Sequence, residues 1–225
     1  MVVAIHQPDY LPYPGFFYKI YRCDTFVFLD DAQYSNTGMH NVNRIKTSQR
    51  ALSLKVPVKQ TLGDLICDVT TRDNLNWKRK HLRTIALNYC KAPFYRPVYD
   101  IYKQLLTRDY DSIADMNEAI ILRFCKEVGL ERKFVRSSAL GVNSSKEQRL
   151  VDICGKLGAD VYYSGTGAKD YLTGDLFKEA GITLVYSDYR PIVYPQPGHF
   201  IPNLSILDYF FNCGFNLNFD VLPTL

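Results

Sequence analysis

The segment from residue 133 to residue 189 constrains the fold most, because short apolar runs alternate there with amphipathic patterns. The apolar runs span 133–140, 159–165 and 182–189, and the helical patterns span 144–158 and 169–181. Strands and helices that alternate at this spacing form right-handed crossovers, which pair the strands in parallel. The sequence therefore predicts an α/β fold, with a mostly parallel sheet of Rossmann-like or nucleotidyltransferase-like type flanked by helices.

The N-terminal part of the chain adds strands to this sheet. The runs VVAI at 2–5 and DTFVFLDD at 24–31 are rich in β-branched and aromatic residues and do not alternate, as is typical of strands covered on both faces. Residues 51–58 alternate like a half-exposed strand, whereas residues 74–135 have helical spacing. We expect one α/β domain over residues 1–225, with 74–134 as a helical insert or subdomain.

Charge and cysteine content narrow the class of protein. The 225 residues carry a formal net charge of +4, which suits a phosphate-bearing small molecule, and they lack the concentrated basic stripe of most nucleic-acid binders. The six cysteines are dispersed without a CxxC spacing, as is typical of buried thiols in a reducing compartment. With no signal-peptide pattern and no long apolar stretch, we expect a cytoplasmic protein without a membrane span.

Polar or small residues follow each strand expected in the parallel sheet. They are His6, Gln7, Asp30, Asp31, Ser137, Ser138, Ser164, Gly165, Thr166, Gly167, Ser187 and Asp188. Ligands of open parallel sheets bind outside the carboxyl ends of the strands, so these residues predict a single cleft. Ordinary turns also use serine, aspartate and glycine, and this structural interpretation stays open.

The stretch AIHQPDYLPYPGFFYK at residues 4–19 is expected to form the first wall of that cleft. Its prolines stiffen a loop, which lowers the entropy lost on closing over a ligand. In this interpretation Tyr10 and Tyr13 stack on a flat ring, and Lys19 meets a phosphate. The alternative is that the aromatic rings belong to the core and His6 is a buried structural histidine.

Four longer motifs resemble the WbqC-like protein family. They are HQPDYLPYPGFFYKIYRCDTFVFLDDAQYS, NVNRIKT, GADVYYSGTGAKDYL and FIPNLSILDYFFNCG, which together run from His6 to Gly214. The resemblance implies a bacterial protein of O-antigen, lipopolysaccharide or other surface-polysaccharide biosynthesis. It further implies a transferase that decorates an amino sugar, with glycine transfer suggested for some members.

Amide formation on an amino sugar needs a proton acceptor and groups that hold the substrate. We predict His6 as general base, because an unperturbed imidazole titrates near neutral pH. Asp30 and Asp31 are predicted to orient it, bind an ammonium group or hold magnesium. The predicted catalytic residues are therefore His6, Asp30 and Asp31. No two of the four histidines have the spacing of zinc ligands, so no zinc site is predicted.

The predicted binding residues fall into three groups. Lys19, Arg44 and Lys46 are candidates for phosphates, SGTGAKD at 164–170 is a candidate anion site at a helix N-terminus, and Asn43 lies in an expected loop suited to sugar hydroxyls. His199 is expected in a loop that closes over the cleft. The predicted binding set is Gln7, Tyr10, Tyr13, Lys19, Asn43, Arg44, Lys46, Ser164, Gly165, Gly167, Lys169, Asp170 and His199.

Two functions of different class remain open at this point. The first is an acyl or aminoacyl transferase, or an ATP-dependent amide-forming ligase, that acts on a nucleotide-linked amino sugar. The second is a non-catalytic sugar-nucleotide-binding module that serves a glycosyltransferase. The sequence leaves ATP with magnesium, acyl-CoA and aminoacyl-tRNA open as sources of the acyl group, and the tyrosine-rich helical segment open as a homodimer face or a lid.

Overall fold

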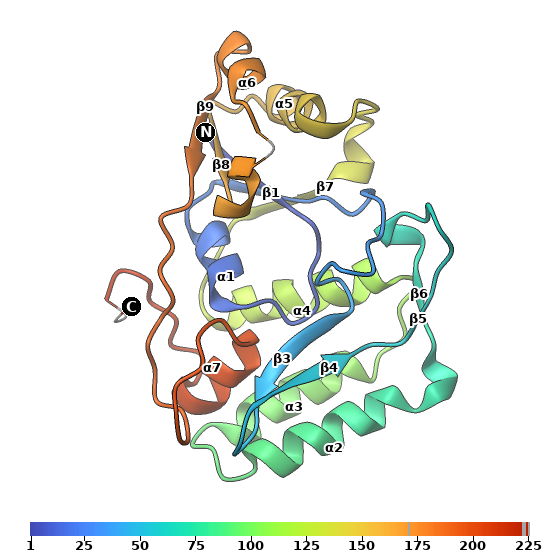
Figure 1. Ribbon diagram of the computed structural model, residues 1–225, viewed down its shortest axis with the longest axis vertical. Helices are drawn as coiled ribbons and strands as arrows, with labels where there is room; N and C mark the ends of the chain where they lie inside the picture. The colour runs from blue at the N-terminus through green and yellow to red at the C-terminus, as the bar shows by residue number, and fades with distance from the viewer. Residues whose placement is uncertain (171, 222–223, 225) are drawn as a thin grey trace.

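A five-stranded parallel sheet organises the protein (Figure 1). The computed structural model describes residues 1–170, 172–221 and 224. The strands run in the order β7-β2-β1-β8-β9, and each neighbouring pair is parallel. Their bounds are β1 Val2–His6, β2 Thr25–Phe28, β7 Lys133–Arg136, β8 Val161–Ser164 and β9 Thr183–Tyr186. The α/β fold expected from the sequence is confirmed.

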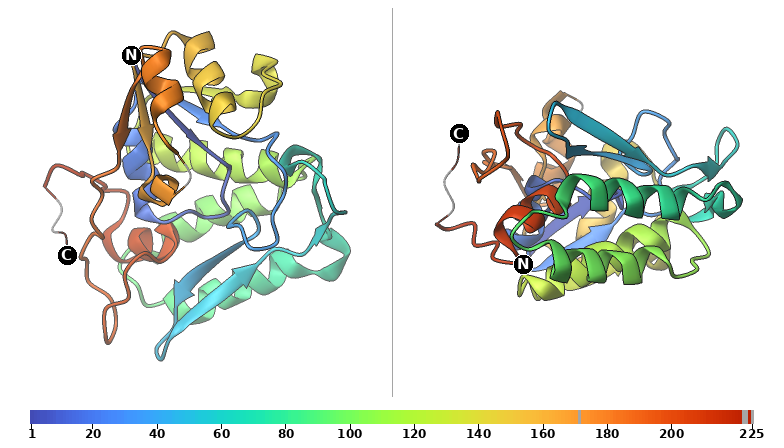
Figure 2. Two further views of the ribbon diagram at one scale, coloured as in Figure 1. Left: turned by 45° about the horizontal axis from the view of Figure 1, so that its top comes forward. Right: turned by 90° about the horizontal axis from the view of Figure 1, so that it is seen from below.

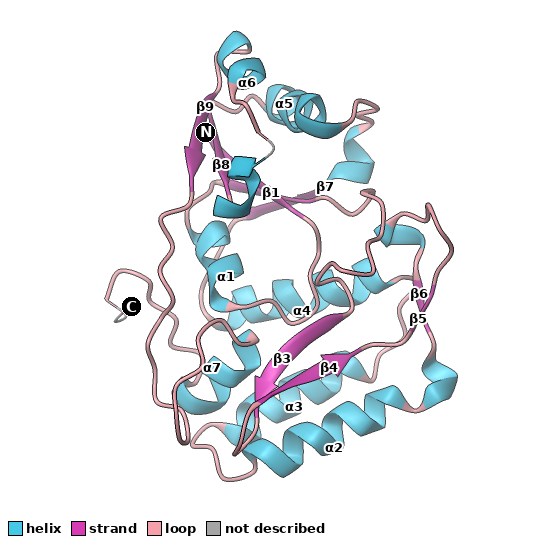
Figure 3. Ribbon diagram, viewed as in Figure 1, coloured by secondary structure: helices cyan, strands magenta, loops and turns pink. Residues whose placement is uncertain are grey.

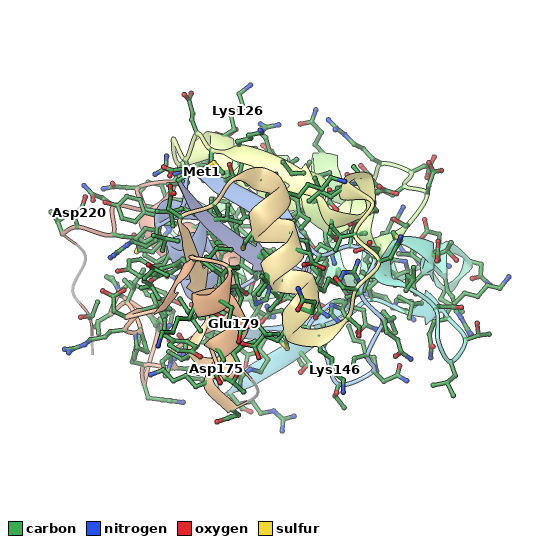
Figure 4. The ribbon with its side chains drawn as sticks, turned by 90° about the horizontal axis from the view of Figure 1, so that it is seen from above. Met1, Lys126, Lys146, Asp175, Glu179 and Asp220 are labelled. Carbon is green, nitrogen blue, oxygen red and sulfur yellow. The ribbon has the colours of Figure 1, made fainter. Side chains whose placement is uncertain are left out.

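Helices cover both faces of this sheet. One face carries α5 (Lys146–Leu157) and α6 (Asp175–Glu179), and the other carries α1 (Pro14–Tyr21), α4 (Ile113–Glu127) and α7 (Ile206–Cys213). Figure 4 looks onto the first of these faces, with Lys146 at the start of α5 and Asp175 and Glu179 at the two ends of α6.

The alternation of side chains along β1 explains the two layers. Val3 and Ile5 pack into the core cluster under α5 and α6, whereas Ala4 packs into the cluster shared with α1 and α7. Successive residues of a strand point to opposite faces, so a strand covered on both faces must be apolar at every position. The unalternating run at the N-terminus is therefore the central strand.

Helix α1 replaces part of the loop that the prolines of the opening stretch led us to expect. The helix begins at Pro14, where the fixed φ of proline suits the first turn and the missing N–H costs no hydrogen bond. Phe16, Phe17 and Ile20 are buried against the sheet, and Lys19 lies on the same helix. The core interpretation of these two phenylalanines is thus correct, and Lys19 is held on a rigid element.

The chain between β2 and β7 forms a hairpin, a short ladder and three helices. Their bounds are β3 Val42–Lys46, β4 Ala51–Lys55, β5 Val58–Lys59, β6 Thr70–Thr71, α2 Trp77–Tyr89, α3 Tyr95–Leu106 and the α4 range given above. Figure 2 shows the β3–β4 hairpin alongside α2 and α3, at the end of the molecule farthest from α5 and α6. Asn43 was expected in a loop but lies on β3, because β4 supplies antiparallel partners for all five residues of that strand.

Short 3₁₀ helices lie between the longer elements. Residues 137–140 were expected to continue the strand that begins at residue 133, but they form the 3₁₀ helix η3 Ser137–Leu140. The others are η1 Ile66–Asp68, η2 Asp73–Leu75 and η4 Thr166–Asp170. Figure 3 shows that the chain from β9 to α7 runs mainly as a loop. Ser205 then caps α7, because its hydroxyl accepts a hydrogen bond from the N–H of Leu207. In the described part of the chain, no helix has the length and apolar character needed to cross a bilayer.

Candidate functional site

A pocket of about 430 Å³ lies at the carboxyl ends of β1, β8 and β9, and we call it the main pocket. Its polar walls come from His6 and Gln7 after β1, from Ser164–Gly167 after β8, and from Ser187 after β9. The sheet order reverses between β1 and β8, since β2 and β7 follow on one side of β1 and β8 and β9 on the other. Ligand sites of open α/β sheets lie at such a reversal.

The ends of the other two strands are tied to each other instead. Asp30 accepts hydrogen bonds from the N–H of Ser138 (3.0 Å) and from its hydroxyl (2.6 Å). Asp31 accepts one from Ser137 and forms an ion pair with Arg149 at 2.5 Å. Neither aspartate lines the main pocket. In this conformation both carboxylates are already satisfied by protein groups.

The ammonium group of Lys19 is buried beside the main pocket. The side chain is 7% exposed, and a Cβ atom built on Gly165 would lie only 3.3 Å from its Nζ. No hydrogen bond or ion pair joins this Nζ to any described residue. Burial lowers the pKa of Lys19 to about 8, against the opposing attraction of Asp9. A buried cation without a partner favours an anionic ligand.

His6 faces the main pocket as a neutral imidazole. Its Nδ1 lies 2.9 Å from the carbonyl oxygen of Gln7, and its ring packs edge-on against Phe16. Assigning the proton to Nδ1, which then donates to this carbonyl, leaves Nε2 as an acceptor. Burial first and the charge of Lys19 second lower the pKa of His6 to about 3. The ordinary imidazole pKa assumed for a general base therefore does not apply to the empty site.

Asp9 is the titratable residue that the sequence reasoning missed. It is 8% exposed, and its carboxylate lies between two imidazoles, 3.7 Å from Nδ1 of His6 and 3.6 Å from Nδ1 of His40. Burial raises the pKa of Asp9 to about 7, although Lys19 acts in the opposite direction. The sequence signal was an acidic residue three positions after His6, inside a motif of prolines and aromatic residues.

A second pocket of about 260 Å³ adjoins this carboxylate, and Asp9, Arg44 and Asn203 contribute to its walls. Tyr13 contributes to the walls of both pockets. The ring packs edge-on against Tyr189, with 5.8 Å between centroids. A Cβ atom at position 15 would overlap the ring of Tyr13, so the glycine there leaves the ring its place.

Asn43 holds the wall of the second pocket in an unusual backbone conformation. Its amide donates to the carbonyl oxygens of Tyr10 (3.2 Å) and Leu11 (2.9 Å). Leu11 has a φ of +46°, which bulky residues rarely adopt, and the Asn43 clamp stabilises the turn. The amide nitrogen predicted for sugar hydroxyls thus already bonds to the backbone, whereas Arg44 is exposed in the pocket wall.

Lys46 and His199 meet each other away from both pockets. The Nζ of Lys46 donates to the carbonyl oxygen of His199 and to Oε1 of Gln196, the latter at 3.2 Å. Lys46 is buried, while the side chain of His199 is exposed and lines neither pocket. These hydrogen bonds therefore connect the segment after β9 to the β3–β4 hairpin.

The remaining predicted binding residues divide between the core and the rim. Tyr10 is fully buried, and its hydroxyl contacts Tyr102 (2.6 Å) and Nδ1 of His81 (3.0 Å). Lys169 lies over the ring of Tyr186 at 5.3 Å and is exposed. Ser164, Gly165 and Gly167 line the main pocket, Asp170 is exposed, and Tyr171 of the same motif lies outside the described residues.

The possible metal ligands among the described residues do not form a cluster. Among these residues, no three His, Cys, Asp or Glu side chains are grouped so that they would hold a metal ion. The groups that face the main pocket are instead a lysine, an imidazole, hydroxyls and glycine backbone. These groups suit a ligand with an anionic part and hydrogen-bonding hydroxyls.

Comparison with known proteins identifies the family to which the chain belongs. A relative from Mycobacterium tuberculosis, uncharacterized protein Rv1507c, is 32% identical over 217 residues, and the match covers 94% of either chain. No solved structure matches the chain significantly. The profile of the WbqC-like protein family matches residues 7–218. On these findings, the chain belongs to the WbqC-like protein family.

Proposed function

We propose that this protein is a transferase or ligase of surface-polysaccharide biosynthesis that acylates the amino group of a nucleotide-linked amino sugar. The observation that carries the proposal is the unpartnered ammonium of Lys19 at the main pocket. A pyrophosphate is the part of a nucleotide sugar that such a buried cation recognises. The family resemblance supports the acyl-transfer step and the polysaccharide pathway.

Three features of the main pocket suit the parts of such a ligand. Phosphate oxygens would lie against Nζ of Lys19 and the backbone of Gly165 and Gly167, where the absence of a side chain permits close approach. The rings of Tyr13 and Tyr189 offer an apolar wall for a flat base or a sugar face. Gln7 and Ser187 supply hydrogen bonds for hydroxyls.

We assign His6 as the proton acceptor. In the proposed step, the amine nitrogen bonds to the carbonyl carbon of an activated acyl donor, and the bond from that carbon to the leaving group breaks. The amine proton passes to Nε2 of His6. An anionic ligand would neutralise Lys19, which removes one of the three causes that lower the pKa of His6. The nearby Asp9 carboxylate, 3.7 Å away, would stabilise the resulting imidazolium.

One observation favours the second candidate, a non-catalytic sugar-nucleotide-binding module. A His6 pKa of about 3 makes the imidazole of the empty site a weak base, although it remains a good hydrogen-bond acceptor. The two functions predict the same ligand in the same pocket. They differ in whether an amide product accumulates.

The experiment is a thermal-shift screen against ATP, CoA and UDP-, TDP- and GDP-linked sugars, with and without magnesium. A ligand that binds only the native state raises the melting temperature by mass action. We expect a shift with a nucleotide sugar that is lost in Lys19→Met and kept in Lys178→Met, a matched variant of an exposed lysine. A shift that survives in Lys19→Met, or no shift at all, would contradict the proposal.

Turnover separates the enzyme from the binding module. With the ligand identified, amide product is assayed by mass spectrometry with ATP plus an amino acid, with acyl-CoA, or with aminoacyl-tRNA. We expect His6→Gln to bind the nucleotide sugar and to lose product formation. Binding without product in the wild-type protein, with each of the three donors, would favour the non-catalytic module.

A further inference from the structure

We propose that the second pocket binds a small zwitterion, with its ammonium group against Asp9 and its carboxylate against Arg44. An α-amino acid is the simplest molecule of this class. The binding claim does not depend on the proposed function, whereas a role for the zwitterion as acyl donor would rest on it.

The first support is the state of the Asp9 carboxylate. Asp9 is 8% exposed and lines the second pocket, and its carboxylate accepts no hydrogen bond from any described residue. The nearest nitrogens, on His6 and His40, lie 3.7 and 3.6 Å away, beyond hydrogen-bond distance. Lys19 attracts this carboxylate but lies outside ion-pair distance of it. A buried carboxylate without a donor is stabilised by a cationic ligand.

The second support is the position of Arg44. Its guanidinium belongs to the wall of the same pocket, yet no ion pair within 4.0 Å links Arg44 to Asp9 or to another carboxylate among the described residues. Two opposite charges therefore share one pocket without touching. A ligand that carries both charges would bridge this gap, and the planar fork of arginine suits a carboxylate in particular.

The third support is the size and the placement of the pocket. Its volume of about 260 Å³ lies below the range of about 300–1,000 Å³ that is typical of drug-sized ligands, so it suits a molecule of amino-acid size. Tyr13 contributes to the walls of both pockets, so the two pockets adjoin each other. A zwitterion bound here would lie next to a ligand in the main pocket.

The test is isothermal titration calorimetry of the full chain with four probes: L-alanine, glycine, acetate and ethylamine. We expect the two amino acids to bind and the two singly charged probes to bind at least about tenfold more weakly, because each lacks one charge-assisted contact. Acetate or ethylamine binding as tightly as L-alanine would overturn the inference, and so would the absence of amino-acid binding.

Variants locate the binding. Asp9→Asn and Arg44→Gln should each weaken L-alanine binding by about 10- to 100-fold, whereas Arg50→Gln, an exposed arginine of the same hairpin, should leave it unchanged. Circular dichroism and the melting temperature of each unliganded variant verify the fold. Unchanged binding in folded Asp9→Asn or in Arg44→Gln would overturn the inference.

The two proposals fail separately. Lys19→Met should lose nucleotide-sugar binding and should weaken L-alanine binding far less than Asp9→Asn does, because Lys19 lines only the main pocket and acts on Asp9 from a distance. L-alanine binding in a protein that binds no nucleotide sugar would support the second-pocket site and contradict the proposed function. Nucleotide-sugar binding without any amino-acid binding would support the proposed function and contradict the second-pocket site.

Discussion

Two buried lysines, Lys46 and Lys19, have opposite surroundings. Lys46 is 4% exposed, and its ammonium donates to the carbonyl oxygen of His199 and to the side chain of Gln196. Lys19 is buried to a similar extent, but its ammonium has no hydrogen-bond or ion-pair partner in the described part of the chain. The ammonium of Lys46 thus joins two segments of the fold, whereas that of Lys19 borders the main pocket without a protein partner.

Two buried aspartates, Asp208 and Asp9, differ in the same way in their hydrogen bonding. Asp208 accepts hydrogen bonds from the hydroxyls of Tyr89 and Tyr194, and its surroundings contain no pocket among those described. Asp9 accepts no hydrogen bond and borders a pocket. Buried polar groups that are fully bonded stabilise a unique structure, whereas an unpaired one costs free energy unless a ligand satisfies it. Hydrogen bonding therefore distinguishes Asp208 and Lys46, which stabilise the fold, from the candidate binding residues Asp9 and Lys19.

The largest effect on stability is expected when Asp208 is replaced. Asp208→Ala leaves the hydroxyls of Tyr89 and Tyr194 buried without an acceptor, so we expect a loss of about 3 kcal/mol in the free energy of unfolding. Urea denaturation measures it. The control is Asp220→Ala, since Asp220 also accepts from a tyrosine hydroxyl, that of Tyr21, but is exposed. Equal losses in the two variants would mean that Asp208 stabilises the fold no more than the exposed Asp220 does.

The second prediction concerns Lys46. Lys46→Met leaves the carbonyl oxygen of His199 and the side chain of Gln196 without their shared donor, so we expect a loss of about 2 kcal/mol. Lys55→Met, an exposed lysine of the same hairpin, should change the free energy of unfolding by less than about 0.5 kcal/mol. A Lys46→Met protein as stable as the wild type would remove the distinction between the two buried lysines.

The third prediction uses pH to examine Asp9. The folded protein keeps Asp9 protonated up to a pKa of about 7, whereas the unfolded chain releases the proton near 3.8. Between these values the folded state binds more protons, so this carboxyl lowers the stability as pH rises from about 4 to 7. His6 and His40, whose pKa values are lowered to about 3 and about 4, act in the opposite direction.

The contribution of Asp9 is therefore measured as a difference. Relative to the wild type, Asp9→Asn should gain about 1–2 kcal/mol in the free energy of unfolding between pH 4 and pH 7. Urea denaturation of both proteins at several pH values in this window gives the comparison. A constant difference across the window would show that Asp9 titrates normally and already has a partner.

The smallest expected effect belongs to Lys19 in the empty protein. Lys19→Met removes a buried charge but also its attraction to Asp9, so we expect a net gain of only about 1 kcal/mol at pH 7. The lysine penalty is complete below its folded pKa of about 8 and disappears as pH rises towards the unfolded value of 10.5. The gain should thus shrink above pH 8 in thermal or urea denaturation. A loss of stability would indicate a protein partner for Lys19.

The sequence was sufficient for the sheet because each strand carries its own pattern. β1, β2, β7, β8 and β9 are short apolar runs, and the rule that polar residues gather at their carboxyl ends predicted His6, Gln7 and Ser164–Gly167 at one pocket. Strand β3 escaped prediction because its polar sequence gains strand structure only from pairing with β4.

The missed parts of the site depend on partners far away in the chain. Asp30 gives no sign in the sequence that Ser138, 108 positions later, will satisfy its carboxylate. Tyr10 is similarly drawn into the core by the hydroxyl of Tyr102, 92 positions away. Asp9 was overlooked for the opposite reason, because only the packed structure shows that no donor reaches it.

The place of β1 in the sheet has a consequence for synthesis on the ribosome. β1 is made almost 160 residues before its neighbour β8, whose Val161 pairs with Val2. At about 5–20 residues per second, the central strand waits for about 10–30 s with one edge uncovered. The main pocket, which needs the ends of both strands, is therefore among the last features of the nascent chain to form, and no ligand of that pocket can assist the earlier steps of folding.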